Sequence, residues 1–261
     1  GNHSAKGSAM TQPHDPYSGH PGYAGHQPPT PHMIPPGPPR RLDAVESLSQ
    51  GWKALASNLL PWVLSMLAFL AVFVVLMVVA VVPIALSETA SEDRAVALAP
   101  ATVAALIIAY LIAFAIGVVW TLNVYRNAVR QVQGEAVTLG SFFQVRDLGV
   151  PFVAYLLMSL AVFVGMLLLV LPGLALAVLL MFVPYLAFSR PETGLSGIFR
   201  GSVEIVRNNL GAALLLILFT MLLGAVGSLT VIGIFITQPL IAVMMAHAAV
   251  QGTGDRVVYR P

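Results

Sequence analysis

The chain alternates between short amphipathic segments and long apolar runs. In the first amphipathic segment, residues 42–60, helical spacing collects apolar side chains on one face: Val45, Leu48, Trp52, Leu55 and Leu59. The run that follows, residues 61–86, carries no charge and exceeds the ~20 residues that a helix needs to cross the hydrocarbon core. The pattern predicts a helix lying on a membrane surface, followed by a transmembrane helix.

The same pattern occurs twice more, with amphipathic segments at 135–149 and 189–209. Further transmembrane helices are predicted at 96–122, 150–171, 174–188, 210–229 and 232–250. We expect the helix of the second span to continue to near Gly134. Pro172 and Gly173 are expected to form the turn before the fourth span, and Gly and Ser residues place another turn near 228–233. The sequence therefore predicts an all-α polytopic membrane bundle of six transmembrane helices, arranged as three repeated units of an amphipathic helix plus a transmembrane hairpin.

Residues 10–41 have a different composition, rich in Pro, Gly, His and Tyr and poor in aliphatic side chains. Such a segment cannot bury enough apolar surface to offset its ordering entropy, so we predict a disordered tail. Four histidines recur at six-residue intervals: His14, His20, His26 and His32. A low-complexity tether is favoured, and a weak metal-binding or protein-docking tail is the alternative. We expect residues 1–9 to be a vector-derived leader, with Met10 as the native start, and residues 252–261 to be a short C-terminal tail.

The composition supports the membrane interpretation and excludes several kinds of functional site. Hydrophobic residues make up 57% of the chain and charged residues 9%, whereas soluble domains carry roughly 25% charged residues. The absence of cysteine excludes disulfides, thiolate metal sites and cysteine nucleophiles. A formal net charge of +2 does not indicate a nucleic-acid partner, so membrane lipids are the expected surroundings.

The distribution of Lys and Arg predicts the orientation. With the N-terminus inside, the outer turns hold Arg94 alone, and the inner segments hold the cations Arg40, Arg41, Lys53, Arg126, Arg130, Arg146, Arg190, Arg200, Arg207, Arg256 and Arg260. Both termini and all three amphipathic segments are therefore predicted on the cytoplasmic side of a bacterial inner membrane.

Candidate chemistry is sparse. Every predicted span lacks Asp, Glu, Lys and Arg, which argues against ion-coupled transport. No hydrolase or phosphate-binding motif occurs, so no enzyme, cofactor or metal site is predicted. Four polar residues are expected to line a cavity or to form hydrogen bonds between helices: Tyr110, Asn123, Tyr125 and Asn127. Residues expected to anchor the amphipathic segments at the interface are Trp52, Phe142, Phe143 and Phe199. The lone His247 is expected to be a helix-packing residue.

Two stretches resemble a bacterial family. Residues 197–219 (GIFRGSVEIVRNNLGAALLLILF) and 171–188 (LPGLALAVLLMFVPYLAF) resemble the YciC-like family of uncharacterised integral membrane proteins. That family is akin to the membrane domain of some glycerophosphodiester phosphodiesterases. Ser202 and Asn208 match its A-L-x-x-S-x-x-L-x-x-x-N pattern, whereas Ile198 departs from the Ala-Leu start. The resemblance, over most of 43–251, implies a six-span fold with cytoplasmic surface helices. The catalytic barrel has no counterpart here, so it implies no activity.

These observations favour a non-enzymatic scaffold or accessory factor of the cell envelope, with the N-terminal tail as a possible docking arm for a protein partner. The alternative is a transporter or lipid-handling protein with a cavity between the repeats. The sequence leaves the oligomeric state open.

Overall fold

Helices account for most of the described residues, because long runs of Ala, Leu, Val and Met combine helix-forming residues with continuous apolar surface. The computed structural model describes residues 31–88 and 92–260. The predicted leader and the tail up to residue 30, with His14, His20 and His26, lie outside the described residues. The helices are α1 (Ala44–Ala56), α2 (Leu59–Glu88), α3 (Glu92–Val132), α4 (Gly149–Leu168), α5 (Val170–Leu179), α6 (Val183–Ser189), α7 (Gly194–Asn208), α8 (Leu210–Ser228) and α9 (Val231–Thr253). Two short 3₁₀ helices, η1 (Leu139–Phe143) and η2 (Pro191–Thr193), and two strands, β1 (His32–Ile34) and β2 (Val257–Tyr259), complete the described elements.

Six stretches within the described residues are long and apolar enough to cross a membrane. They are Leu59–Val82, Pro100–Val132, Gly149–Leu168, Val170–Ser189, Leu210–Ser228 and Val231–Thr253. This confirms the predicted all-α, six-span membrane fold. Helix α3 continues past the predicted end of the second span at residue 122 and ends at Val132, close to the predicted Gly134. The last two spans turn at Leu229 and Thr230, as expected.

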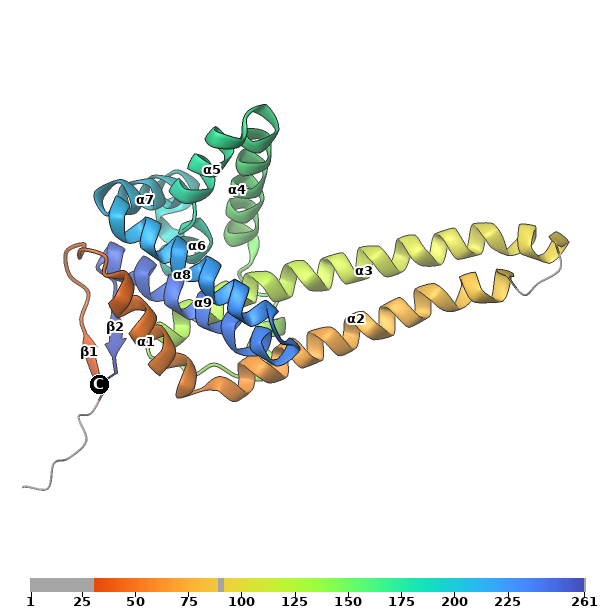
Figure 1. The fold of residues 1–261 in the computed structure, drawn as a ribbon, viewed down its shortest axis with the longest axis horizontal. Coiled ribbons are helices and arrows are strands. Elements are labelled where there is room, and N and C mark those ends of the chain that lie inside the picture. Colours follow the sequence, from red (N-terminus) through yellow and green to blue (C-terminus); the bar gives the residue numbers. More distant parts are fainter. Residues whose placement is uncertain (1–30, 89–91, 261) are drawn as a thin grey trace, which may run out of the picture. The chain divides into compact units, whose positions relative to one another are not determined.

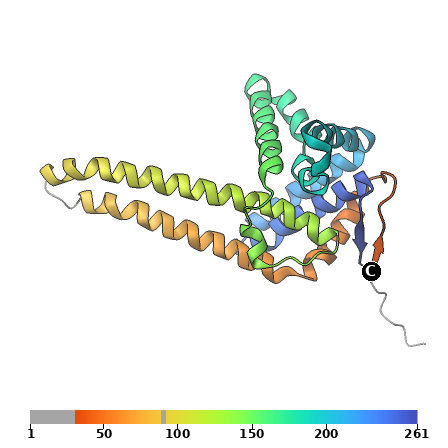
Figure 2. The ribbon, with the colours of Figure 1, turned by 180° about the vertical axis from the view of Figure 1, so that it is seen from behind.

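The spans pair as helical hairpins. Helices α2 and α3 lie side by side along their length, α4 packs against α5, and α8 packs against α9 (Figures 1 and 2). Short elements precede the hairpins: α1 before α2, η1 before α4 and α7 before α8. The order matches the predicted succession of surface segment and hairpin, whereas the relation of the three units as repeats stays a prediction.

The second surface segment differs from the sequence prediction. An amphipathic helix was expected over 135–149, but the structure has only the five-residue 3₁₀ helix η1 there. Local side-chain hydrogen bonds replace the α-helical ones: the hydroxyl of Ser141 donates to the carbonyl oxygen of Thr138 at 2.6 Å and accepts from the amide of Thr138 at 3.3 Å. Val137, Thr138 and Gly140 also have low helix propensity.

The sequence prediction also placed the turn between the third and fourth spans at the wrong residues. The chain turns at Leu169, which has extended backbone angles, and Pro172 and Gly173 lie inside the first turn of α5. Proline is tolerated there because the first-turn amides have no partner within the helix. A Cβ at Gly173 would lie 2.5 Å from the amide nitrogen of Met166, so glycine is what allows α5 to approach α4 closely. The fourth span is further divided, with α5 ending at Leu179 and α6 beginning at Val183.

Residues 32–41 and 254–260 form a terminal clasp, although sequence predicted tails at both ends. Strand β1 pairs antiparallel with β2, with His32 opposite Tyr259 (Figure 1). The amide of Gly37 donates to the carbonyl oxygen of Gly254 at 2.8 Å. Backbone groups in residues 32–41 thus form hydrogen bonds with the C-terminal residues of the chain.

Arg190 ties the terminal clasp to α6. Its guanidinium donates to the carboxylate of Asp255 at 2.8–3.1 Å and to the carbonyl oxygen of Thr253 at 2.7 Å. The hydrogen bond to Asp255 raises the pKa of Arg190 above its ordinary value, so Arg190 keeps its charge.

The core centres on the second half of α9, where nearly every residue from Leu240 to Thr253 is buried. Helix α1 packs directly on it: a Cβ at Gly51 would lie 2.9 Å from the Cα of Met244. The buried face of α1 is formed mainly by small and polar residues, whereas Val45 and Trp52 are 61% and 50% exposed. The apolar stripe read from the sequence is therefore split, with Leu55 in the core and Trp52 outside.

We expect Gly51→Ala to destabilise the fold, because the added methyl group meets the backbone of α9 rather than a movable side chain. Overpacking costs about 1–3 kcal/mol, and each kcal/mol lowers the melting temperature by about 2–4 °C in a chain of this size. Thermal unfolding in detergent, followed by circular dichroism, measures the change. Gly211→Ala in α8 is the matched control, because the structure leaves open space at that Cβ. Equal melting temperatures for the two variants would contradict the close approach.

We expect Arg190→Gln to loosen the terminal clasp, because Asp255 and the Thr253 carbonyl lose their charged donor. Hydrogen exchange followed by mass spectrometry should show severalfold faster exchange at 255–260. Arg200→Gln removes an exposed arginine from α7 and should leave that exchange unchanged.

Candidate functional site

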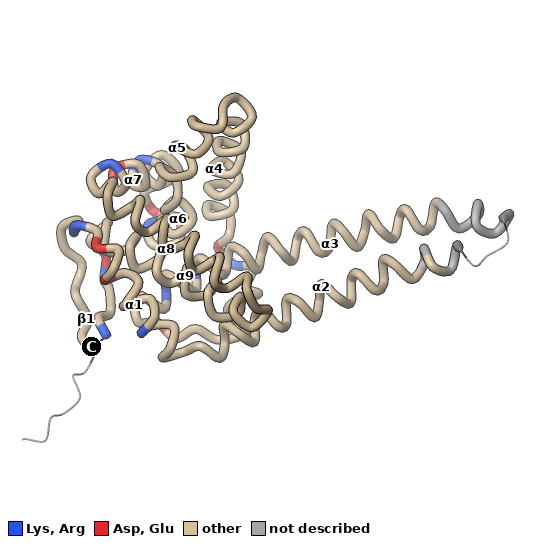
Figure 3. Tube along the Cα trace, in the orientation of Figure 1, with Lys and Arg blue, Asp and Glu red and all other residues tan. Residues whose placement is uncertain are grey.

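Charged side chains of the described residues gather at one end of the helical hairpins. Figure 3 shows them over α1, α7, the strands and the C-terminal part of α3, whereas the drawn lengths of α2, α4, α5 and α8 extend away from them. The sequence has no Asp, Glu, Lys or Arg at 54–87, 95–125, 148–189 or 208–254. We call this part of the molecule the charged end.

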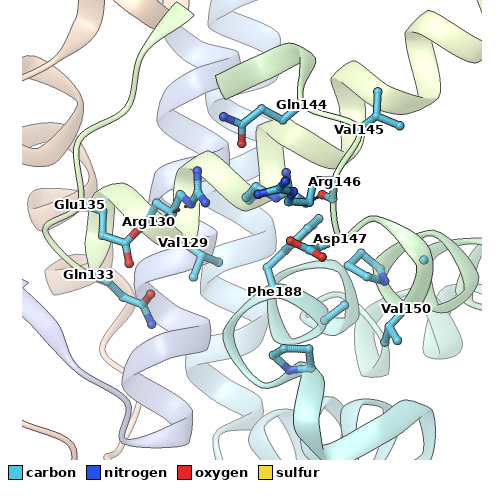
Figure 4. A pocket seen from close by; sticks show the side chains of 15 residues that line it. Val129, Arg130, Gln133, Glu135, Gln144, Val145, Arg146, Asp147, Val150 and Phe188 are labelled. Carbon is cyan, nitrogen blue, oxygen red and sulfur yellow. Dashed lines mark hydrogen bonds and ion pairs between the residues drawn. The ribbon is translucent and has the colours of Figure 1, made fainter. Parts of the chain in front are cut away.

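An open cleft of ≈ 1100 Å³ lies at the charged end (Figure 4), beside the point where α3 and α4 diverge (Figure 1). Its walls are the C-terminal turns of α3, the loop before α4, and the junction of α6 with η2. Three arginines and two carboxylates line it: Arg126, Arg130, Arg146, Glu135 and Asp147. We call it the arginine cleft.

Arg126 is the structural member of the three. Its side chain is almost fully buried, and its guanidinium donates to the carbonyl oxygen of Arg146. The guanidinium also lies 5.2 Å from the centre of the Phe188 ring, a cation–π distance. Arg126 therefore joins the loop before α4 to α3 and α6.

Arg130 follows Arg126 by one helical turn, so both face the arginine cleft. Its Nε lies 3.5 Å from the carboxylate of Glu135, and Arg256 approaches the other oxygen of that carboxylate at 3.9 Å. The side chains of Arg130 and Glu135 are 37% and 48% exposed, so this ion pair is screened by solvent and leaves the guanidinium accessible.

Arg146 and Asp147 form the exposed rim of the cleft (Figure 4). The Arg146 guanidinium makes no hydrogen bond or ion pair with the part of the chain that the structure describes. Asp147 adopts φ 59°, a left-handed conformation that Asp tolerates better than most residues and that turns the chain into α4. Guanidinium groups in an open cleft suit phosphate and carboxylate oxygens, which they bind in a bidentate manner.

The predicted polar residues Asn123 and Asn127 lie buried on one face of α3. The amide nitrogen of Asn123 donates to the carbonyl oxygen of Gln144 at 2.8 Å, which fixes the loop that carries Arg146. Both polar atoms of the Asn127 side chain have no hydrogen-bond partner among the described residues.

The other two predicted polar residues lie apart from these asparagines. Tyr125 projects from another face of α3, and its ring centre lies 5.8 Å from that of Tyr155 and 5.1 Å from that of Tyr185. Tyr110 is 68% exposed and stacks on Phe114 of its own helix. The four residues therefore do not form one cluster.

The four predicted interfacial anchors also differ in how far their side chains are exposed. Trp52 is half exposed on α1, and Phe143 and Phe199 are half-buried. Phe142, in contrast, is fully buried and packs edge-on against Trp62 at 4.9 Å. The prediction for Phe142 was wrong, because the compact turn η1 points that side chain into the core.

His247 packs in the interior, as sequence suggested. Its Nδ1 lies 3.1 Å from the hydroxyl of Ser47, and its ring meets Tyr259 of the terminal clasp edge-on. The described residues hold no cluster of three or more His, Asp or Glu side chains that could bind a metal ion.

Sequence reasoning did not identify the arginine cleft. The spacing of Arg126 and Arg130 was a usable signal, since residues four apart share a helix face. Arg146 lacked such a signal, because its position depends on the loop that Asn123 and Arg126 hold in place.

Comparison with known proteins gives distant relatives. An uncharacterised protein of Mycobacterium tuberculosis is 31% identical to this chain over 126 residues, and a protein of Mycobacterium bovis matches equally. The match covers 48% of this chain and 38% of each relative, so the chain spans well under half the length of the curated relatives it matches. No family model and no solved structure matches.

We expect Arg126→Lys to loosen the loop at 144–149, because a compact ammonium cannot lie over the Phe188 ring and bond the Arg146 carbonyl at the same time. Hydrogen exchange across the loop should quicken although the charge is kept. Arg207→Lys in α7 is the matched control and should leave the loop unchanged. Unaltered exchange in Arg126→Lys would show that Arg126 acts as a charge alone.

Proposed function

We propose that this chain is a non-enzymatic membrane protein that binds the headgroups of anionic phospholipids in the arginine cleft. The observation that carries the proposal is the position of the cleft: three arginines line an open space where the charge-free runs 95–125 and 148–189 meet the charged end. That boundary corresponds to the headgroup layer of a bilayer. The excess of Lys and Arg there supports a cytoplasmic orientation of the charged end in a bacterial inner membrane.

The charged side chains that line the cleft favour a ligand with a small negative charge. Arg126, Arg130 and Arg146 contribute three positive charges, and Glu135 and Asp147 offset two of them. A phosphodiester with one negative charge fits this balance better than a polyanion does. Helices α3 and α4 diverge from the cleft with exposed apolar surfaces, including Val150 and Val153, against which acyl chains can lie (Figure 1).

A scaffold or accessory role in the cell envelope is the second candidate. The terminal clasp supports it, because the pairing of β1 with β2 fixes residues 32–34 beside residues 257–259. A partner captured by the upstream segment would then be held at the charged end. Lipid binding and a scaffold role are compatible, and neither requires catalysis.

The proposal predicts that the protein retains anionic phospholipids in preference to zwitterionic ones. Native mass spectrometry of the protein from mixed nanodiscs should show more retained phosphatidylglycerol than phosphatidylcholine. Replacing Arg130 and Arg146 by Gln removes two accessible guanidinium groups, each contributing about 0.2–1 kcal/mol, so the preference should fall about fivefold. Asp147→Asn removes a negative charge from the rim and should raise the preference.

The matched control is the double variant Arg200→Gln and Arg207→Gln, which removes the same charge from exposed positions of α7. It should change the preference little. An equal loss in both double variants would mean that the lipid responds to the overall surface charge and would overturn the cleft as the binding site.

A further inference from the structure

Helix α3 ends in a Schellman motif that places Glu135 beside Arg130. The amide of Glu135 donates to the carbonyl oxygen of Arg130 at 2.8 Å, and the amide of Gly134 donates to that of Gln131 at 3.3 Å. Gly134 has φ 86°, the left-handed conformation that this motif requires and that glycine adopts without strain. The backbone therefore fixes Glu135 next to Arg130, at one side of the arginine cleft (Figure 4).

The terminal clasp packs against the same turn. The guanidinium of Arg260 donates to the carbonyl oxygen of Gln131 at 3.3 Å. A Cβ at Gly134 would lie 2.6 Å from a methyl carbon of Val258, so β2 contacts the turn itself. Arg256 directly precedes β2, and these contacts hold that part of the chain beside the end of α3.

One carboxylate thus faces two guanidinium groups. The Nε of Arg130 lies 3.5 Å from one oxygen of Glu135, and the Nη2 of Arg256 lies 3.9 Å from the other oxygen. Arg130 lines the arginine cleft, whereas Arg256 is not one of its lining residues. The three side chains are 37%, 48% and 42% exposed, in the order Arg130, Glu135 and Arg256, so the ion pairs can rearrange without opening the core.

A phosphate in the arginine cleft would compete with Glu135 for Arg130. Phosphate and carboxylate oxygens accept from the same N–H groups of a guanidinium, so Arg130 cannot serve both fully. Arg256 weakens the competition, because it attracts the Glu135 carboxylate and offsets its charge. Without Arg256, Arg130 would be the remaining ion-pair partner of Glu135 among the described residues.

We propose that Arg256 is a positioning residue for the arginine cleft: it holds Glu135 and thereby leaves Arg130 available to the phosphate of an anionic phospholipid. The inference rests on the proposed function, because it concerns the same binding site. It also couples the terminal clasp to the cleft, since a lipid that takes Arg130 leaves Glu135 to Arg256 alone. Such coupling is reciprocal, so bound lipid strengthens the attachment of the clasp to the end of α3.

A double-mutant cycle tests the proposal. The readout is the preference of the full chain for phosphatidylglycerol over phosphatidylcholine, measured by native mass spectrometry from mixed nanodiscs at low salt, where exposed charges are least screened. Arg256→Gln should lower the preference and Glu135→Gln should raise it, each by at most about fivefold, because exposed ion pairs are weak. In the Glu135→Gln background, Arg256→Gln should have no further effect, since the carboxylate through which it acts is gone.

Two further variants separate positioning from charge and from folding. Arg207→Gln removes an exposed arginine from α7 and should change the preference little in either background. Arg256→Lys keeps the charge beside Glu135 and should retain most of the preference. An equal loss from Arg256→Gln with and without Glu135 would show that Arg256 acts directly on the lipid or on the fold, and would overturn the proposal. An unchanged preference in Arg256→Gln would overturn it as well.

Hydrogen exchange provides a readout on the clasp itself. Exchange at 255–260 should be slower in nanodiscs of phosphatidylglycerol than in nanodiscs of phosphatidylcholine, by at most about fivefold. The difference should disappear in Glu135→Gln, which cannot pass the effect of the lipid to Arg256. A clasp whose exchange is the same in both lipids would contradict the coupling.

The double variant Arg130→Gln and Arg146→Gln separates this inference from the proposed function. If it loses the preference for phosphatidylglycerol while Arg256→Gln keeps the wild-type value, the arginine cleft stands and the role of Arg256 falls. If the double variant keeps the wild-type preference, the cleft is not the lipid site, and both proposals fall.

Discussion

The burial of the second half of α9 is the constraint on which the rest of the ordered structure depends. From Leu240 to Thr253 this helix is almost completely enclosed, although composition alone makes it a candidate membrane span. Helices α1, α3 and α8 pack on it, and the terminal clasp covers its end. The approach is close because Gly51 of α1 presents no side chain to Met244. A transmembrane segment in lipid needs only an apolar surface, but this one also needs matched surfaces on all sides. The charged end is therefore assembled around α9, and the hairpins extend from it.

The spans were predictable because hydrocarbon imposes one requirement that local sequence satisfies by itself. A run such as 61–86 must form a helix, since each backbone group has to find its partner within the segment. Outside the spans no such requirement holds, and local side-chain hydrogen bonds or long-range contacts decided the structure. Residues 135–149 have the apolar spacing of a surface helix, but the Ser141 hydroxyl and low-propensity neighbours fold them as η1. Residues 31–41 have the composition of a disordered tail, and β2 supplies the partner that orders them. The partner lies more than 200 residues away, so local composition could not reveal it.

The candidate site was less predictable than the fold for a related reason. Asn123 and Tyr125 were recognised as polar residues at a span end, but their spacing of two places them on different faces of α3. Asn123 fixes the loop of the arginine cleft, whereas Tyr125 enters an aromatic cluster with Tyr155 and Tyr185. Arg146 reaches the cleft only because the loop folds back onto α3. A sequence pattern identifies residues that share a face of one helix, whereas a cleft between elements requires the turns that join them.

One turn of helix α3 links the arginine cleft to the interior of the bundle. Arg126 lines the arginine cleft, and the adjacent Tyr125 enters the aromatic cluster with Tyr155 and Tyr185. Consecutive residues of a helix point about 100° apart, so this turn presents a cation to the cleft and an aromatic ring to the interior. The same turn is anchored in three directions, by Arg126 to the loop before α4, by Tyr125 to α6, and by the buried residue Val129 to the core. A turn fixed in this way holds the Arg126 guanidinium in one position in the cleft. The arginine cleft is therefore shaped by the same contacts that pack α3 into the bundle, so its walls are in place before any ligand binds.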